Sequence, residues 1–225
     1  MKRKALIWGG LTVVLAIATF VILQLAGNQE ESQAVSQASS TTQQDQSGNG
    51  FVNILDVRED DWTKGNPDAD IVVIKYSDFQ CPSCLFQAAM DQKVTEELSD
   101  EVLFVYRHFP LPSHQYARLA AKYAEAAGNQ GKFWEMHDLI FTNQRQWSGG
   151  RAASAFQQLA QSLDIDMEQL KNDVTDPEIA KHIDAEYQQG DNLGVTGVPS
   201  IFINGQKMPF SGSIDQYRNQ ILSFK

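Results

Sequence analysis

The chain has 225 residues, of which 42% are hydrophobic, and carries a formal net charge of −10 at pH 7. This length suits one globular domain of ordinary size with appendages. The strong negative charge argues against nucleic acid as a partner.

The first fifty residues divide into three segments. Residues 1–4 contain three basic residues, and residues 5–26 are an uncharged apolar segment. Because a helix rises 1.5 Å per residue, this segment spans about 33 Å, the thickness of a bilayer's hydrocarbon core. We therefore predict a single transmembrane anchor at 5–26, with 1–4 in the cytoplasm and the rest of the chain outside. A cleaved secretory signal is the alternative, although Gln24-Leu25-Ala26 fits a cleavage site poorly.

The residues after the predicted anchor form two segments that differ in composition. Residues 27–49 are rich in Gln, Ser, Thr and Gly, which predicts a flexible linker. Residues 50–225 form the predicted globular domain. It opens with an edge-like strand at Phe51–Val57 and a polar connection containing Trp62.

Both cysteines lie two residues apart in Cys81-Pro-Ser-Cys84, where a predicted strand meets a predicted helix. The strand is the short apolar run Ile71–Tyr76, rich in β-branched residues. The helix follows from an apolar spacing of four residues, with a predicted buried stripe of Phe86, Met90, Val94 and Leu98 and with Leu85 and Ala89 alongside. Pro82 suits the first helical position, where its missing N–H costs nothing.

This position predicts a reactive Cys81. The free N–H groups and the dipole of a helix N-terminus stabilise an anion, and the pKa of Cys-X-X-Cys thiols falls to roughly 3.5 to 7.5. A low pKa also makes Cys81 a good leaving group, so that a Cys81–Cys84 disulfide passes readily to other thiols. A structural disulfide is a weaker interpretation, because closing four residues would remove only about 2 kcal/mol of unfolded-state entropy.

The remaining elements alternate between β and α structure. Val102–Tyr106 predicts a second strand, which with the helix before it forms a βαβ unit and therefore a parallel pair. From about 113 to 193 the pattern is helical, with Ser113 and Asp176-Pro177 as predicted helix starts. The chain then returns to a strand at Ile201–Ile203, an Asn-Gly turn, a strand at Gln206–Met208 and a final helix capped by Ser213.

Four motifs in order resemble the DsbA-type branch of the thioredoxin superfamily, in the membrane-anchored, BdbD-type form of Gram-positive bacteria. They are YSDFQCPSC from Tyr76, YRHFPL from Tyr106, AAKYAEAAGNQGKFWEMHDLIF from Ala120 and GVTGVPSIFING from Gly194. The resemblance implies an α/β thioredoxin fold, with a helical insertion between the βαβ unit and the C-terminal ββα unit.

The resemblance also implies a site and partners. Cys81 and Cys84 are the expected catalytic residues, supported by Pro82, Ser83, Val198 and Pro199. The family's pattern makes Val198-Pro199 a cis peptide against the redox pair, whereas the sequence alone indicates a strand-start proline. The expected activity is disulfide formation in reduced exported proteins, with a DsbB-like quinone-linked membrane protein as reoxidase. We expect no cofactor, because the chain carries no cofactor-binding motif.

One residue departs from the family's best-known strong oxidants. They carry histidine where this chain has Ser83, and a serine offers the thiolate only a hydroxyl. The direction of exchange is therefore open, and a disulfide reductase or isomerase on the same fold is the nearest alternative. A non-enzymatic binding or chaperone-like surface protein is the other.

Other uses of these residues fit the sequence less well. A zinc site built on His108 and His114 would require unusual spacing from the cysteines, with prolines between the histidines. A cysteine hydrolase would leave Cys84 unexplained. We expect Asp78 to be an exposed loop carboxylate and assign no role to two further histidines or to three tryptophans expected to pack: His137, His182, Trp62, Trp134 and Trp147.

Overall fold

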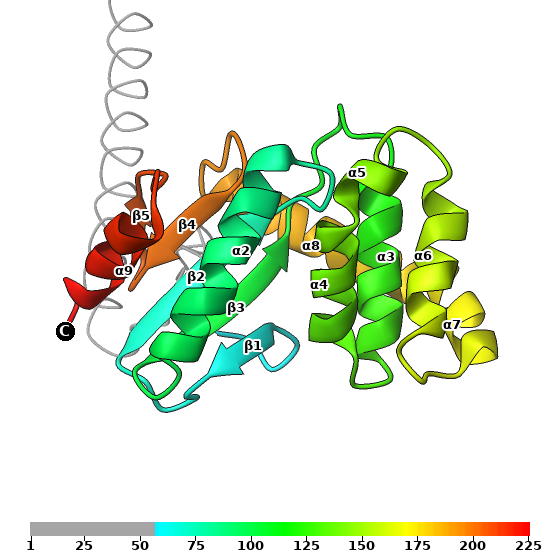
Figure 1. The fold of residues 1–225 in the computed structure, drawn as a ribbon. Helices are drawn as coiled ribbons and strands as arrows, with labels where there is room; N and C mark the ends of the chain where they lie inside the picture. Colours follow the sequence, from blue (N-terminus) through cyan, green and yellow to red (C-terminus); the bar gives the residue numbers. More distant parts are fainter. Residues whose placement is uncertain (1–56) are drawn as a thin grey trace, which may run out of the picture. The chain divides into compact units, whose positions relative to one another are not determined.

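A five-stranded sheet organises the protein, and the computed structural model, which describes residues 57–225, orders its strands β1-β3-β2-β4-β5 (Figure 1). Its strands are β1 (Trp62–Gly65), β2 (Ile71–Ser77), β3 (Val102–His108), β4 (Ser200–Ile203) and β5 (Gln206–Met208). β2 and β3 are parallel, which confirms the prediction from the βαβ order. The other neighbouring strands are antiparallel.

Helices cover both faces of β2, which explains why its sequence is an apolar run and not a polar-apolar alternation. On one face, Ile71 and Val73 belong to a core shared with α2 (Pro82–Glu97) and α9 (Ile214–Leu222). On the other face, Ile74 and Tyr76 pack in a core to which Tyr187 of α8 (Pro177–Asn192) contributes.

The predicted helical insertion between the βαβ and ββα units is confirmed. Beside the sheet in Figure 1 lie the helices α3 (Ala117–Gly128), α4 (Phe133–Thr142), α5 (Gln144–Trp147), α6 (Ala152–Gln161) and α7 (Met167–Val174). Together with Phe79, Cys84 and Tyr106, they enclose a core in which buried alanines of α3 pack close to aromatic residues such as Phe133 and Phe156. α8 leads the chain from the insertion back to β4, so the insertion is connected to the sheet through β3 at its start and through α8 at its end.

Several local signals are confirmed at the predicted residues. Asp176 caps α8 by accepting from the Glu178 N–H, with Pro177 at the first helical position. Asn204 and Gly205 both have positive φ, at 45° and 79°, as a two-residue hairpin turn requires. Ser213 caps α9 through the N–H of Gln216.

Two local predictions are wrong, and a third lies almost wholly outside the described residues. β1 lies where we predicted a polar connection, because Trp62–Gly65 pairs antiparallel with β3. The predicted strand at Phe51–Val57 falls, except for Val57, outside the described residues. α3 begins at Ala117 and not at a Ser113 cap, because residues 112–116 form turns and Tyr116 takes the cap position.

The predicted buried stripe of α2 is confirmed at Met90, Val94 and Leu98 and is wrong at its first residue, Phe86. The buried residues of α2 are Cys84, Gln87, Met90 and Val94, whereas the side chain of Phe86 is 48% exposed and Ala89 is exposed. The register follows from Cys84, which lies inward at the start of the helix. Gln87 fills the position one turn later because its amide donates to Asp91 at 2.8 Å.

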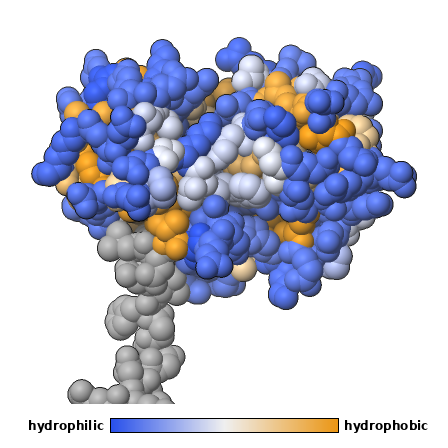
Figure 2. All heavy atoms as spheres, turned by 90° about the horizontal axis from the view of Figure 1, so that it is seen from below, coloured by the Kyte–Doolittle hydropathy of each residue, from blue (hydrophilic) through white to orange (hydrophobic). Residues whose placement is uncertain are grey.

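The predicted anchor at 5–26 and linker at 27–49 lie outside the described residues. Among residues 57–225, no helix is both long and apolar enough to span a bilayer. These residues all fall within one compact unit, 51–225. The face of this unit shown in Figure 2 is mostly hydrophilic, with hydrophobic residues in separate patches.

Candidate active site

The two cysteines occupy the first turn of α2, as predicted. Cys81 is the N-cap residue, with extended backbone angles of −78° and 123°, and Pro82 is the first helical residue. The Cys81 carbonyl accepts the N–H groups of Cys84 and Leu85 at 3.1 and 3.2 Å. Both cysteines are free thiols, with Cys84 fully buried and Cys81 6% exposed. Pro82 and Ser83 between them are exposed, so this turn faces solvent.

The environment separates the two thiols chemically. A hydrogen bond from the Cys84 thiol lowers the pKa of Cys81 from 9.0 to about 6, against the opposing effect of burial and with help from the backbone N–H groups of Cys84 and Ser83. Burial raises the pKa of Cys84 well above its ordinary value. Near neutral pH, Cys81 is therefore mostly the nucleophilic thiolate, and Cys84 is the proton-carrying partner.

The Val198–Pro199 peptide is cis and lies against the redox pair, as the family resemblance implied. The carbonyl of Val198 lies 3.6 Å from the sulfur of Cys81, and this segment leads directly into β4. Val198 and Pro199 are partly exposed. All six predicted site residues therefore come together at one edge of the sheet.

Two glutamines tie the active-site turn to the helical insertion, and the sequence analysis identified neither. The side-chain amide of Gln144, buried in α5, donates to the carbonyls of Phe79 and Cys81 at 2.7 and 2.9 Å. Gln80 accepts the N–H of Tyr116 at 2.7 Å and donates to the carbonyl of Ser148 at 3.2 Å. Glutamine in a helical stretch has no pattern that identifies such contacts, which join residues more than thirty positions apart.

Asp78 corrects another prediction, because its side chain is fully buried and not an exposed loop carboxylate. Its oxygens accept the N–H groups of Gln80 and Leu111 at 2.6 and 2.8 Å and the Nδ1 of His114 at 2.8 Å. The Cys81 N–H donates to the Asp78 carbonyl at 3.1 Å. A buried carboxylate thus adjoins the reactive thiol.

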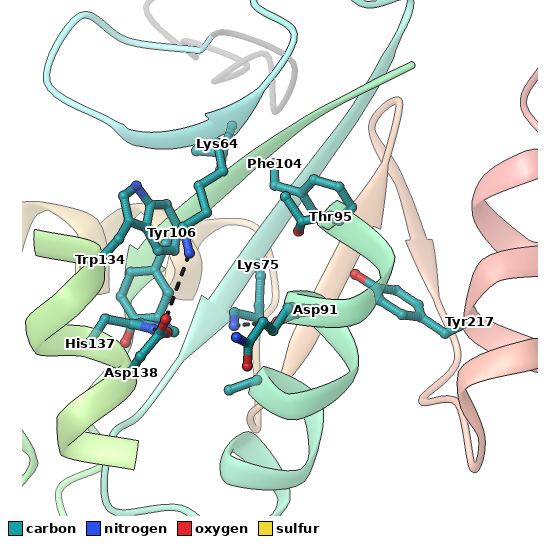
Figure 3. A pocket seen from close by; sticks show the side chains of 13 residues that line it. Lys64, Lys75, Asp91, Thr95, Phe104, Tyr106, Trp134, His137, Asp138 and Tyr217 are labelled. Carbon is teal, nitrogen blue, oxygen red and sulfur yellow. Dashed lines mark hydrogen bonds and ion pairs between the residues drawn. The ribbon is translucent and has the colours of Figure 1, made fainter. Parts of the chain in front are cut away.

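A cavity lined by aromatic and charged side chains lies between α2, the sheet and α4 (Figure 3). Lys75 of β2 pairs there with Asp91 of α2, and Lys64 faces Asp138 across the opening. The cavity has about 30 Å³ of space for the centres of water-sized molecules, enough for about two waters. Among the described residues, three buried polar groups that line it lack a partner in ordinary hydrogen-bond geometry: Tyr106 OH, His137 Nε2 and Tyr217 OH.

The histidines considered for zinc lie in different environments. His108 Nε2 bonds Glu125 at 2.8 Å, whereas His114 bonds Asp78. Within residues 57–225, no group of three or more His, Cys, Asp or Glu side chains is arranged to hold a metal ion. His137 is buried and pairs with Asp138, and burial lowers its pKa to about 4.

The tryptophans pack as predicted. Trp62 stacks on Phe133 with ring centroids 4.3 Å apart and donates to Glu125 at 2.7 Å. Trp134 donates to the Thr63 carbonyl at 2.9 Å, and Trp147 is fully buried.

Comparison with known proteins assigns the family. The thioredoxin family model matches residues 58–222, which is most of the chain. The chain belongs to the thioredoxin superfamily. It superposes on a thioredoxin-like oxidoreductase from Silicibacter pomeroyi with 26% identity and a TM-score of 0.64, covering 74% of this chain and 92% of that one. Its fold is DsbA-like, because it also superposes on alpha-DsbA1 from Wolbachia pipientis with 20% identity and a TM-score of 0.67, covering 75% and 92%. BdbD from Bacillus subtilis superposes with 22% identity and a TM-score of 0.64, covering 72% and 91%.

The chain is also similar to curated proteins that are named Na⁺/H⁺ antiporters. It is 35% identical to a Na⁺/H⁺ antiporter NhaA 1 from Salinispora arenicola over 158 residues, which are 69% of this chain and 23% of the relative. The NhaA 3 antiporter from Salinispora tropica is 37% identical over 150 residues, 65% of this chain and 22% of the relative. The chain thus spans about a quarter of the length of these relatives, and a shared region underlies the similarity.

Proposed function

We propose that the protein is an extracytoplasmic thiol:disulfide oxidoreductase that introduces disulfides into exported proteins through Cys81 and Cys84. The observation that carries this proposal is the asymmetry of the pair: a thiolate-forming Cys81 at a helix N-terminus, and a buried, protonated Cys84 hydrogen-bonded to it. The solved structure from Silicibacter pomeroyi is described as a thioredoxin-like oxidoreductase, which supports the same class of chemistry.

The reaction begins with the oxidised form. A substrate thiolate attacks the sulfur of Cys81, the Cys81–Cys84 bond breaks, and a mixed disulfide forms while Cys84 leaves as a thiolate and takes up a proton. A second substrate thiolate then attacks the substrate sulfur of the mixed disulfide and releases Cys81 as a thiolate. The substrate loses two electrons and two protons overall, and the cysteine pair gains the two electrons. The turn at Pro82-Ser83 is exposed, and the rings of Phe86 and Phe210 are half exposed. A protein substrate can therefore reach these residues.

The proton on Cys84 requires a path, because the thiol is fully buried. The hydroxyl of Ser77 adjoins the Cys84 thiol and also the Tyr106 phenol. Tyr106 lines the cavity in Figure 3, where Lys75 and Asp91 lie. We include this cavity in the proposal as the route by which Cys84 exchanges its proton with solvent.

The direction of exchange depends on how strongly the reduced pair is stabilised. A stable Cys81 thiolate favours the reduced form and makes the disulfide a stronger oxidant. The pKa of Cys81, about 6, lies between that of thioredoxin, about 7, and that of DsbA, about 3.5. We therefore expect a reduction potential between about −270 and −120 mV, the values of those two proteins.

The proposed location rests on the predicted anchor, and the proposed reoxidising partner rests on the family resemblance. The anchor proposed at 5–26 would hold the domain on the outer side of the membrane, where disulfides persist. A DsbB-like quinone-linked membrane protein would take up the electrons from the reduced pair. Reduced exported proteins would be the substrates.

Two variants test the proposed reaction in cells. Cys84→Ala removes the group that competes for Cys81, so we expect mixed disulfides between Cys81 and exported proteins to accumulate on non-reducing gels. The matched control is the double variant Cys81→Ala/Cys84→Ala, which should form none. Equal amounts of adduct in both variants, or none in either, would contradict dithiol exchange, and a potential near −270 mV would reassign the protein as a reductase.

A further inference from the structure

Asp78 is the buried carboxylate nearest in sequence to the reactive thiol. It follows the end of β2 and precedes Cys81 by three residues, and its carbonyl accepts the Cys81 N–H at 3.1 Å. Its side chain has no exposed surface. A buried carboxylate must be satisfied by donors or by a positive charge, because isolated burial is costly.

The three donors to the Asp78 side chain come from two segments. Gln80 N–H comes from the active-site turn, and Leu111 N–H and His114 Nδ1 come from the segment after β3, at 2.6, 2.8 and 2.8 Å. The first two are backbone groups, so His114 is the donor whose side chain can also carry positive charge. His114 is 23% exposed, and the solvent reaches it while the carboxylate stays covered.

A negative charge at this position opposes a second one on Cys81. Like charges in a partly desolvated site raise the free energy of both ionised forms. Consistent with this, the charge of Asp78 acts to raise the pKa of Cys81, as the smallest of several contributions. Donors that hold the Asp78 charge should weaken that repulsion, which links His114 to a thiol it does not touch.

We propose that Asp78 and His114 together tune the redox potential of the Cys81–Cys84 pair: the Asp78 carboxylate makes the disulfide less oxidising, and His114 counteracts it. This inference rests on the proposed function for its biological meaning. In this proposal a histidine outside the Cys-X-X-Cys motif influences the redox pair, whereas Ser83 inside the motif offers the thiolate only a hydroxyl.

Substitutions of Asp78 and His114 should change the Cys81 ionisation midpoint in opposite directions, which distinguishes tuning of the redox pair from a merely structural role. In the full-length chain, Asp78→Asn should lower the pH midpoint of Cys81 ionisation, measured by thiolate absorbance, by about half to one unit, since it removes a nearby charge. The equilibrium constant for oxidation of glutathione by the disulfide should rise by about three- to tenfold. His114→Ala should shift both quantities the other way, and His114→Gln, which can still donate but never carries charge, separates charge from hydrogen bonding.

The decisive measurement is the double variant. In the Asp78→Asn background, His114→Ala should leave the Cys81 midpoint within about 0.2 units of Asp78→Asn alone, because its effect passes through the carboxylate. Asp191→Asn, an exposed residue of α8, removes the same charge elsewhere and should change neither quantity. Shifts of equal sign in both single variants, or a His114→Ala effect that persists without Asp78, would overturn the inference.

The test of this inference is kept separate from effects on folding and from the test of the proposed function. If Asp78→Asn unfolds the chain, the His114 variants still test the inference, because His114 is partly exposed and its loss should raise the Cys81 midpoint. Both measurements use only the cysteine pair and glutathione. A failure of the proposed substrate oxidation would therefore leave these shifts intact, and a failure of the shifts would leave the oxidation of substrates intact.

Discussion

Cys81 depends on its partner cysteine more than on any other single group. The hydrogen bond from the Cys84 thiol is the largest influence that lowers its pKa, ahead of the backbone N–H groups of the helix start. The sequence predicted a low pKa from the helix N-terminus and from the Cys-X-X-Cys motif. The structure adds that Cys84 remains protonated through burial and can therefore donate.

This dependence predicts how alkylation varies with pH. In the reduced chain, the rate of Cys81 modification by iodoacetamide should rise with pH through a midpoint near 6, because only the thiolate reacts. Cys84→Ala removes the donor and should raise the midpoint by at least one unit, a change of about 1.4 kcal/mol in thiolate stability. Ser83→Ala is the control, because the Ser83 backbone N–H is retained and the midpoint should stay near 6. An unchanged midpoint in Cys84→Ala would assign the shift to the helix start instead.

At the scale of single residues, the sequence predicted the site residues that can be identified from their neighbours in the chain or from the family resemblance. Cys81, Cys84 and Pro82 follow from spacing, and the cis Pro199 follows from the resemblance. Asp78 was predicted to be exposed because a loop carboxylate usually is, whereas its burial depends on donors from Leu111 and His114, more than thirty positions away. Contacts at that distance in sequence have no periodic signal.

At the scale of elements, prediction succeeded where the signal lies within a few residues. The caps at Asp176 and Ser213 and the Asn204-Gly205 turn depend on hydrogen bonds or backbone angles inside one turn. β1 was missed because it is four residues long and polar, and only its pairing with β3 makes it a strand. Only the first residue of the predicted α2 stripe was wrong, because apolar spacing cannot distinguish Phe86 from Cys84 as the inward residue.

A cluster of charged side chains docks α8 on α3 and on the segment before β1. His182 of α8 lies near Glu186 at 3.5 Å, Asp60 at 3.3 Å and Glu125 of α3 at 3.9 Å. The adjacent Glu186 carboxylate, followed by the charges of Glu125 and Asp60, raises the pKa of His182 to about 9, against burial. The protonated histidine therefore stabilises the folded state more than the unfolded one.

This raised pKa predicts a stability that depends on pH. Because the folded pKa of about 9 exceeds the unfolded value of 6.5, the stabilisation by His182 is complete below about pH 6.5 and is lost as pH rises through 9. Its size should be about 2 kcal/mol, reduced from the full shift because the side chain is 20% exposed. His182→Gln should lower the free energy of unfolding in urea by that amount at pH 6 and by much less at pH 10. Lys181→Gln, exposed on the same helix, should show no such difference, and a parallel loss at both pH values would assign His182 a packing role only.

At the scale of the whole domain, the helical insertion is part of the active site. It is a separate block in Figure 1, yet Gln144 of α5 donates to the turn that carries Cys81. The sequence predicted that an insertion exists and roughly where it begins and ends. That it holds the catalytic turn could not be predicted, because the four-residue α5 itself was not recognised.

The two hydrogen bonds of Gln144 predict how the insertion supports the site. Gln144→Leu keeps the size of the side chain but leaves the Phe79 carbonyl without this donor and the Cys81 carbonyl with only its helical donors. We expect the free energy of unfolding to fall by about 1 to 3 kcal/mol, the cost of leaving a buried carbonyl, that of Phe79, without this donor. Hydrogen exchange should become faster at the amides of residues 79–85 and stay unchanged in α9, which lies away from the insertion (Figure 1).

A matched substitution on the same block separates this effect from a general loss of stability. Gln158→Leu alters an exposed glutamine of α6 and should change neither unfolding nor exchange in the active-site turn. If the insertion positions Cys81, Gln144→Leu should also slow the second-order reaction of the oxidised protein with a dithiol, because a looser turn spends less time in the geometry that exposes the Cys81 sulfur to in-line attack. Normal exchange rates in the turn together with normal dithiol kinetics would show that the insertion packs beside the site without holding it.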